Sequence, residues 1–197
     1  MYGDKGPILI VGILLAAGKS TRFGAPKLLA PLPDGRRLIE AAAQILQNGV
    51  EQVVAVVRPD ADLMAVLNAL KIKVVLNERA DEGMGASIAA GVQATADATG
   101  WLIALGDMPY IRPSTIVQMT SALAHQKGIV VPQFHGRRGH PVGFAKSFQS
   151  QLLALRGDTG AKSIIEGHFA QLTTLDVDDP GIVLDIDFPH DIANVVG

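Results

Sequence analysis

The feature that most constrains the fold is a series of short, uncharged runs rich in Ile, Leu and Val. They lie at residues 8–15, 53–57 and 101–105. Such runs are typical of strands that are buried on both faces, as in a parallel sheet covered by helices. Stretches with helical spacing separate them, at residues 38–47, 61–70 and 114–125. The pattern predicts an α/β domain with a largely parallel sheet.

The same alternation continues beyond these runs and becomes less regular in the last third of the chain. We expect strands near residues 73–76 and 129–131, and a helix that opens at 83–87 and continues to about 96. Residues 134–144 contain three glycines and predict a hairpin beside the sheet. Further helices are expected around 147–155 and 161–169. The apolar residues 182–184 predict a strand before a short final helix.

Composition limits the classes of function. With 197 residues, 48% apolar and 18% charged, the chain can bury a sizeable core and does not resemble a disordered protein. The formal net charge of −2 gives no electrostatic case for a nucleic-acid partner. The sequence has no cysteine, which excludes a disulfide framework and a thiolate nucleophile and favours a cytoplasmic protein. The apolar segment 8–17 is too short to cross a bilayer, so no membrane contact is expected.

The first predicted strand runs into a loop of small residues that carries two spaced cations. Gly18 and Gly24 allow backbone conformations that are closed to other residues, and successive N–H groups in such a turn form a concave anion site. Arg22 and Lys27 add positive charge. These features predict a cradle for a triphosphate, although a solvated turn between a strand and a helix is the alternative.

Part of this loop, Gly18-Lys19-Ser20, resembles the end of a Walker A loop. That motif requires a glycine, four further residues and then Gly-Lys-Ser/Thr. The position of the first glycine is Ile13 in this chain. A P-loop is therefore the second interpretation.

Two acidic segments are candidates for a metal site. Asp107 comes directly after the run at 101–105, where open α/β sheets place their ligands, and a carboxylate there suits Mg²⁺. The alternative is an aspartate that caps the amides of its own loop. Asp185 and Asp187 alternate along a predicted strand end and so point to the same face. Asp187 would otherwise be the N-cap of the final helix.

The loop resembles the signature of the nucleotidyltransferases of the molybdenum-cofactor group, Leu-Ala-(Ala/Gly)-Gly-x-Ser-x-Arg-(Phe/Met)-Gly-x-x-Lys. The matching positions are Leu15, Ala16, Ala17, Gly18, Ser20, Arg22, Phe23, Gly24 and Lys27. The Ala-Ala-Gly form is similar to members that transfer a cytidylyl group. The resemblance implies a single Rossmann-like nucleotidyltransferase domain over residues 1–197, with three α/β/α layers and a mostly parallel mixed sheet. About 1–110 would bind the nucleotide and about 111–197 the acceptor.

The resemblance also implies a reaction. CMP would pass from CTP to the terminal phosphate of molybdenum-molybdopterin, forming the cytosine dinucleotide and pyrophosphate, with Mg²⁺ as the cofactor and Mn²⁺ as an alternative. The attacking phosphate has a second pKa of about 6 and is largely dianionic at neutral pH, so no general base is required. Transient contact with a molybdenum hydroxylase or its chaperone would follow product formation.

Residue roles follow from the same resemblance. The catalytic group would be Arg22, Lys27 and Asp107, and the metal ligands Asp107 and Asp187, with Asp185 as the alternative to Asp187. The nucleotide-binding residues would be Leu15, Ala16, Ala17, Gly18, Ser20, Arg22, Lys27, Asn77, Gly83, Met84 and Ser87. The acceptor-binding residues would be Gly139, His140, Pro141 and Lys162. The sequence departs from the family pattern at Phe188, where Thr is usual, at His190, where Glu is usual, and at Lys162, where Arg is common.

Three other functions stay open. The chain could be a P-loop kinase or ATPase, in which Lys19 would be indispensable. It could be a nucleotide-binding or cofactor-carrier protein without catalytic activity. It could also be a nucleotidyltransferase that uses GTP, or one that acts on a sugar phosphate or isoprenoid phosphate.

Overall fold

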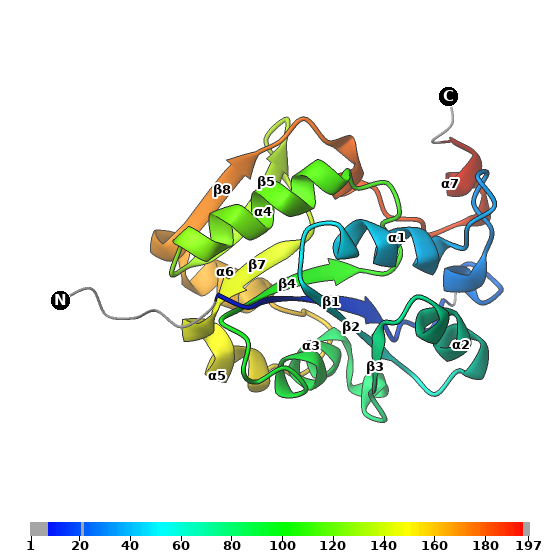
Figure 1. Ribbon diagram of the computed structural model, residues 1–197, viewed down its shortest axis with the longest axis horizontal. Coiled ribbons are helices and arrows are strands. Elements are labelled where there is room, and N and C mark those ends of the chain that lie inside the picture. Colours follow the sequence, from blue (N-terminus) through cyan, green and yellow to red (C-terminus); the bar gives the residue numbers. More distant parts are fainter. Residues whose placement is uncertain (1–7, 21, 195–197) are drawn as a thin grey trace.

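The computed structural model describes residues 8–20 and 22–194, through which one eight-stranded sheet runs (Figure 1). The strands are β1 Ile10–Ala16, β2 Gln52–Val57, β3 Lys73–Leu76, β4 Gly100–Leu105, β5 Ile129–Phe134, β6 Arg137–Arg138, β7 Val142–Ala145 and β8 Leu172–Asp176. Their order is β3-β2-β1-β4-β7-β5-β6, and β8 pairs with β5. Strands β1 to β4 are parallel to one another and β8 is parallel to β5, whereas β7 is antiparallel to both β4 and β5. The predicted mixed, mostly parallel sheet is confirmed.

β1 lies in the middle of the parallel part because its side chains are apolar on both faces. Leu14 and Ala16 belong to the hydrophobic core on one face of the sheet, and Val11 and Ile13 belong to the core on the other. Ile13 lies opposite Val54 of β2 and Ile103 of β4. This register brings the carboxyl ends of the three strands to the same edge of the sheet.

Helices cover both faces of the sheet. They are α1 Leu38–Gln47, α2 Ala61–Ala69, α3 Met84–Gln93, α4 Pro113–His125, α5 Gln149–Leu153, α6 Lys162–Gly167 and α7 Pro189–Asn194. Side chains of α1, α2 and α4 enter one core, and those of α3, α5 and α6 enter the other. Figure 1 shows α1 and α4 on one side of the sheet, with α3 and α5 on the other. The predicted three-layer α/β/α arrangement is therefore confirmed.

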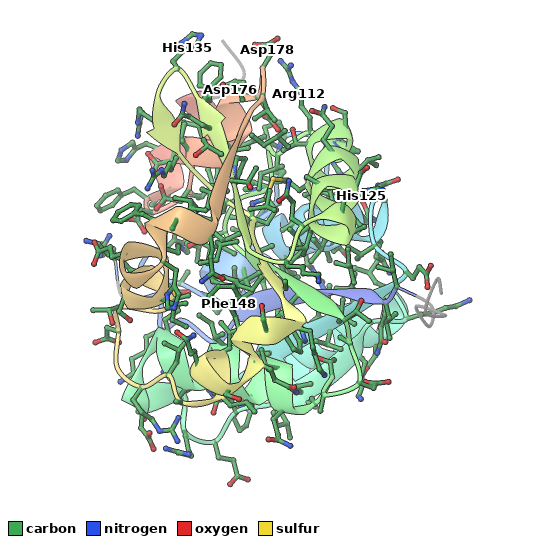
Figure 2. All side chains as sticks on the ribbon, turned by 90° about the vertical axis from the view of Figure 1, so that its left-hand side faces the viewer. Arg112, His125, His135, Phe148, Asp176 and Asp178 are labelled. Atoms are coloured by element: carbon green, nitrogen blue, oxygen red, sulfur yellow. The ribbon has the colours of Figure 1, made fainter. Side chains whose placement is uncertain are left out.

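Figure 2 shows the molecule turned by 90°, with side chains of the interior and of one end of the molecule labelled. Phe148 lies in the interior and is 2% exposed. Arg112, His135, Asp176 and Asp178 lie together at the end where β5 and β8 finish and α4 begins. In the described ranges, no helix is both long and apolar enough to cross a membrane.

The structure corrects three expectations about the elements. The segment 134–144 was predicted as a hairpin beside the sheet, but its last residues belong to β7. This strand lies inside the sheet, between β4 and β5. The predicted strand at 182–184 is wrong: a 3-10 helix occupies Pro180–Val183, and the Asp179 side chain accepts a hydrogen bond from Gly181 N at its start. The helix predicted to reach residue 96 ends at Gln93.

A strand that the sequence did not predict, β8, pairs in parallel with β5. Its sequence, Leu-Thr-Thr-Leu-Asp, carries no long apolar run, and its residues are half-buried or exposed. Such a strand is specified by its partner across the sheet and not by its own pattern.

Candidate active site

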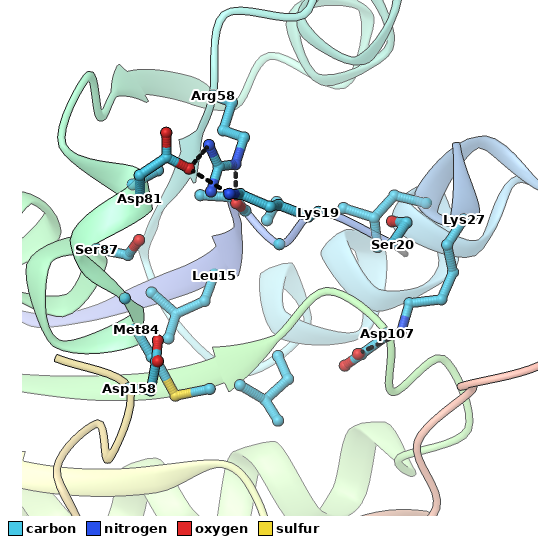
Figure 3. A pocket seen from close by; sticks show the side chains of 17 residues that line it. Leu15, Lys19, Ser20, Lys27, Arg58, Asp81, Met84, Ser87, Asp107 and Asp158 are labelled. Carbon is cyan, nitrogen blue, oxygen red and sulfur yellow. Dashed lines mark hydrogen bonds and ion pairs between the residues drawn. The ribbon is translucent and has the colours of Figure 1, made fainter. Parts of the chain in front are cut away.

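A pocket of about 470 Å³ opens at the carboxyl ends of β1 and β4 (Figure 3). Its lining residues are Leu15, Ala16, Ala17, Gly18, Lys19, Ser20, Lys27, Leu28, Arg58, Ala80, Asp81, Gly83, Met84, Ser87, Leu105, Asp107 and Asp158. All the predicted nucleotide-binding residues are among them except Arg22 and Asn77. The structure therefore brings together most of a set that the sequence places in two separate segments.

The loop after β1 is held at the rim of the pocket by charged side chains. Arg58, which follows β2, donates from Nε to the Ala17 carbonyl at 2.6 Å and from Nη1 to Asp81 at 2.8 Å. Asp81 also pairs with Lys19 at 2.9 Å, and hydrogen bonds from Lys19 and Arg58 lower the pKa of this carboxyl. Sequence reasoning missed Arg58 and Asp81. The only signal for Arg58 was its position at the end of a strand that adjoins β1.

The same loop does not have the geometry of a Walker A motif, in which a helix follows the Gly-Lys-Ser segment. The described residues between Lys19 and Pro26 form turns and bends, and α1 begins only at Leu38. The Lys19 side chain contacts Asp81, on the far side of the pocket from Asp107 (Figure 3). The P-loop interpretation is not supported by this arrangement.

Two carboxylates from distant parts of the chain meet at the ammonium of Lys27. Lys27 Nζ lies 2.8 Å from Asp107 Oδ2 and 3.5 Å from Asp187 Oδ1. Arg22 Nη1 contacts the other oxygen of Asp187, Oδ2. The Lys27 side chain is only 10% exposed. Arg22 and Asp187 also line a smaller hollow beside the main pocket.

The segment that carries Asp187 is an extended loop and not the predicted strand end. It is fixed to the Asp107 loop by a hydrogen bond from Ile186 N to the Asp107 carbonyl, at 2.9 Å. The start of α7 is capped by Asp191, whose Oδ2 accepts from Asp187 N and Phe188 N. These bonds lower the pKa of Asp191. The alternative role of Asp187 as the helix cap is therefore wrong, and its carboxylate faces Lys27 and Arg22.

The oxygen donors of Asp107 and Asp187 fit a small, hard divalent cation. Mg²⁺ typically takes one or two carboxylates from the protein and shares the remaining positions with phosphate oxygens and water. Both carboxylates already converge on one positive charge. No group of three His, Cys, Asp or Glu side chains suited to a metal occurs among the described residues. Asp185 is exposed, and it is Asp187 that shares the Lys27 ammonium with Asp107.

Two of the predicted nucleotide-binding residues, Asn77 and Ser87, differ in their position relative to the pocket. Ser87 lines the pocket, whereas Asn77 lies behind it and is 5% exposed. Asn77 Nδ2 donates to Ser87 Oγ at 3.0 Å, and its Oδ1 accepts from Arg79 N. Asn77 can therefore orient Ser87 without lining the pocket itself.

The segment that opens α3 packs tightly against residues 156–158. Gly83 has φ +103°, and a Cβ there would lie 2.4 Å from Asp158 Oδ1. Gly85 N donates to the Gly157 carbonyl at 2.9 Å. Only glycine fits at position 83, and this close approach brings Asp158 into the pocket wall. Asp158 belongs to the part of the chain, about 111–197, that was expected to bind the acceptor.

The predicted acceptor residues lie in different environments. His140 is partly buried, and its N–H donates to the Ile182 carbonyl at 2.9 Å. Burial lowers the pKa of His140, while the charges of Asp107 and Asp185 act in the opposite direction. Gly139 must be small, because a Cβ there would lie 2.1 Å from the Ile182 carbonyl oxygen. Lys162 is exposed, lies 3.7 Å from Glu166 and is not among the residues that line the pocket.

Comparisons with known proteins bear on this site. A family model, the MobA-like NTP transferase domain, matches residues 12–174. Nicotine blue oxidoreductase of Paenarthrobacter nicotinovorans is 29% identical and covers 94% of this chain and 95% of its own length. A probable molybdenum cofactor guanylyltransferase of Bacillus cytotoxicus is 28% identical, over 66% of this chain and 64% of that protein.

Solved structures have the same architecture. Rv0371c from Mycobacterium tuberculosis H37Rv aligns with a TM-score of 0.83 at 26% identity, covering 96% of this chain and 98% of that one. Its complex with manganese aligns with a TM-score of 0.79, also at 26% identity, over 95% and 97% of the two chains. The residues matched by the family model, 12–174, include all those that line the pocket.

Proposed function

This chain belongs to the MobA-like NTP transferase family, and on that premise we propose that it transfers CMP from CTP to the terminal phosphate of molybdenum-molybdopterin. The products would be the cytosine dinucleotide form of the cofactor and pyrophosphate. The observation that carries the proposal is the meeting of Lys27, Asp107 and Asp187 beside a pocket of about 470 Å³. This charged lining suits a triphosphate. It therefore favours a transferase, although one relative is named as an oxidoreductase.

The chain's own residues would bind and align the reacting groups. The loop amides at 15–20, with Arg22 and Lys27, would neutralise the β- and γ-phosphates. An oxygen of the acceptor phosphate would attack the α-phosphorus, and the bond to the β-phosphate would break to release pyrophosphate. Mg²⁺ or Mn²⁺ held by Asp107 and Asp187 would supply further neutralisation of phosphate charge. The manganese complex of Rv0371c is consistent with a divalent ion in this fold.

Asn77, Gly83, Met84 and Ser87 would recognise the base, with Asn77 acting through Ser87. The preference for CTP rests on the Ala-Ala-Gly form of the first loop, at residues 16–18, which is similar to members that transfer a cytidylyl group. Several curated relatives are named as guanylyltransferases, so GTP is the nucleotide against which the proposal must be tested.

The acceptor would bind at Gly139, His140 and Pro141, and the effect of the Asp107 charge on His140 supports a position near the pocket. A neutral His140 can donate a hydrogen bond to a phosphate or a pterin edge from one ring nitrogen. Lys162 would contribute positive charge only after leaving Glu166.

A cytoplasmic location is part of the proposal and rests on the cysteine-free sequence. The expected contact with a chaperone has no support from the comparisons and is left out of the proposal.

A two-step experiment tests the proposal. Melting temperatures are measured with Mg²⁺ and each of the four nucleoside triphosphates, and pyrophosphate release is then followed with the tightest binder, with and without molybdenum-molybdopterin. We expect CTP to stabilise most and release to depend on the acceptor. Tighter binding and faster turnover with GTP would replace the cytidylyl assignment by a guanylyl one. Binding without acceptor-dependent release would favour a carrier protein.

A further inference from the structure

We propose that Lys27 makes the Asp107–Asp187 pair bind a divalent cation weakly on its own and tightly together with a triphosphate. In this role the lysine ammonium occupies the place between the carboxylates until phosphate oxygens draw it into the pocket. The inference rests on the metal role given to these two carboxylates in the proposed function, and it adds an order to the binding steps.

The contacts of the carboxylate oxygens carry the first step. Three of the four oxygens contact a cation: Asp107 Oδ2 and Asp187 Oδ1 contact Lys27, and Asp187 Oδ2 contacts Arg22. A dication that used both carboxylates would need distances of about 2.0–2.1 Å to oxygen for Mg²⁺. The ammonium stands at 2.8 and 3.5 Å from one oxygen of each aspartate, so the two cations compete for the same position.

Charge and burial make this competition costly for a free metal ion. Two cations already balance the two carboxylates. The Lys27 side chain is 10% exposed and that of Asp107 is 25% exposed, so water screens the repulsion between the ammonium and an entering metal ion only in part. A divalent ion alone would therefore have to displace a buried positive charge without offering it a new partner.

A triphosphate offers that partner. Lys27 also lines the main pocket, beside the loop of residues 15–20, and its ammonium sits on a flexible four-carbon stem. Figure 3 shows Lys27 beside the pocket with its ammonium turned to Asp107. When the ammonium turns to phosphate oxygens, the carboxylates are released for the metal. Metal and nucleotide binding are then coupled, and each must strengthen the other by the same factor.

The test measures Mn²⁺ binding and not turnover. Free Mn²⁺ is followed by electron paramagnetic resonance in titrations of the whole protein, first without nucleotide and then with CTP against a protein-free CTP blank. In the wild type we expect CTP to tighten Mn²⁺ binding about tenfold, within the usual range of such couplings of about 5–150-fold. Lys27→Met should bind Mn²⁺ without nucleotide about tenfold more tightly than the wild type.

Three further variants serve as controls. Lys19→Met removes another lysine of the same pocket, whose partner is Asp81, and should keep the wild-type dependence on CTP. Lys27→Arg keeps the positive charge and should keep weak binding without nucleotide. Asp107→Asn in the Lys27→Met background should abolish the tight binding, which locates it at the carboxylates. Circular dichroism melting of each variant checks that it is folded.

The outcomes separate this inference from the function on which it rests. In one outcome, the wild type and Lys27→Met bind Mn²⁺ equally well without nucleotide, and Asp107→Asn abolishes this binding in both backgrounds. That result would overturn the role of Lys27 and leave the metal site intact. In another outcome, Mn²⁺ binding does not depend on Asp107, either with or without CTP. That result would refute the assigned metal site and, with it, this inference.

Discussion

Two lysines of the same pocket differ in their partners, and this difference predicts their effects on activity. Lys27 contacts the carboxylates of Asp107 and Asp187, whereas Lys19 contacts Asp81 and is 61% exposed. We expect Lys27→Ala and Asp107→Ala each to lower the rate of pyrophosphate release by about 10²–10³-fold, because a preorganised charge is lost from the reacting phosphates. Lys19→Ala should retain most of the rate.

The measurement is steady-state turnover of the three variants, with melting curves to show that each is folded. Retention of more than about a tenth of the wild-type rate by Lys27→Ala or Asp107→Ala would refute the roles assigned to them. Loss of activity in Lys19→Ala with a normal Lys27→Ala would restore the P-loop interpretation.

His140 predicts a pH dependence of stability. Burial lowers its pKa in the folded state below the unfolded value of about 6.5. Below pH 6.5 the unfolded chain therefore binds more protons at this site, and stability is lost as the pH falls. Urea unfolding at pH 7.5 and 5.5 should show a larger loss for the wild type than for His140→Gln. An equal loss in both proteins would show that His140 does not contribute.

At the scale of elements, one buried aspartate joins the two segments that carry the site carboxylates. Asp179 is 1% exposed and accepts hydrogen bonds from Arg112 N, Thr115 Oγ1 and Gly181 N, at 2.8, 2.6 and 2.9 Å. It thus ties the start of α4, just after the Asp107 loop, to the segment that leads to Asp187. Asp179→Ala should lower the free energy of unfolding by about 3 kcal/mol, because buried donors lose their acceptor, and should also lower turnover.

A second buried polar residue provides the matched control. Thr95 is 2% exposed, accepts from Trp101 Nε1 and donates to the Gly91 carbonyl, away from the pocket. Thr95→Ala should lower the free energy of unfolding by about 2 kcal/mol and leave the turnover of folded protein unchanged. If both variants lost turnover alike, Asp179 would have no specific part in placing Asp187.

The elements also show where sequence reasoning succeeds and where it stops. α1 was predicted with its observed bounds, because its helical spacing is local to the segment. The pairing of β7 with β4 and of β8 with β5 joins segments that are distant in the chain, so neither the central place of β7 nor the existence of β8 could be predicted from a local pattern. In the site, the Gly-rich loop and Asp107 lie at a predictable strand end, whereas Asp158 reaches the pocket through the packing of residues 156–158 against Gly83 and Gly85.

At the scale of the whole molecule, the chain's two parts share both cores. The core on one face joins Leu14 and Leu102 with Val130 and Ile182, and the core on the other joins Ile13 with Phe144. The pocket likewise takes Asp158 from beyond the part expected to bind the nucleotide. The division at about residue 110 is therefore a proposed division of binding roles within one folded unit.

This sharing predicts a single cooperative unfolding transition. Trp101, the sole tryptophan, is fully buried in β4, between the parallel strand β1 and the antiparallel strand β7. Its fluorescence should change with urea at the same midpoint as the far-ultraviolet circular dichroism, because removal of either part exposes the edge of β4 and opens both cores. A fragment of residues 1–110 should accordingly show no cooperative transition. Two separate midpoints, or a cooperatively folding fragment, would show that the two parts are independent domains and that the site lies between them.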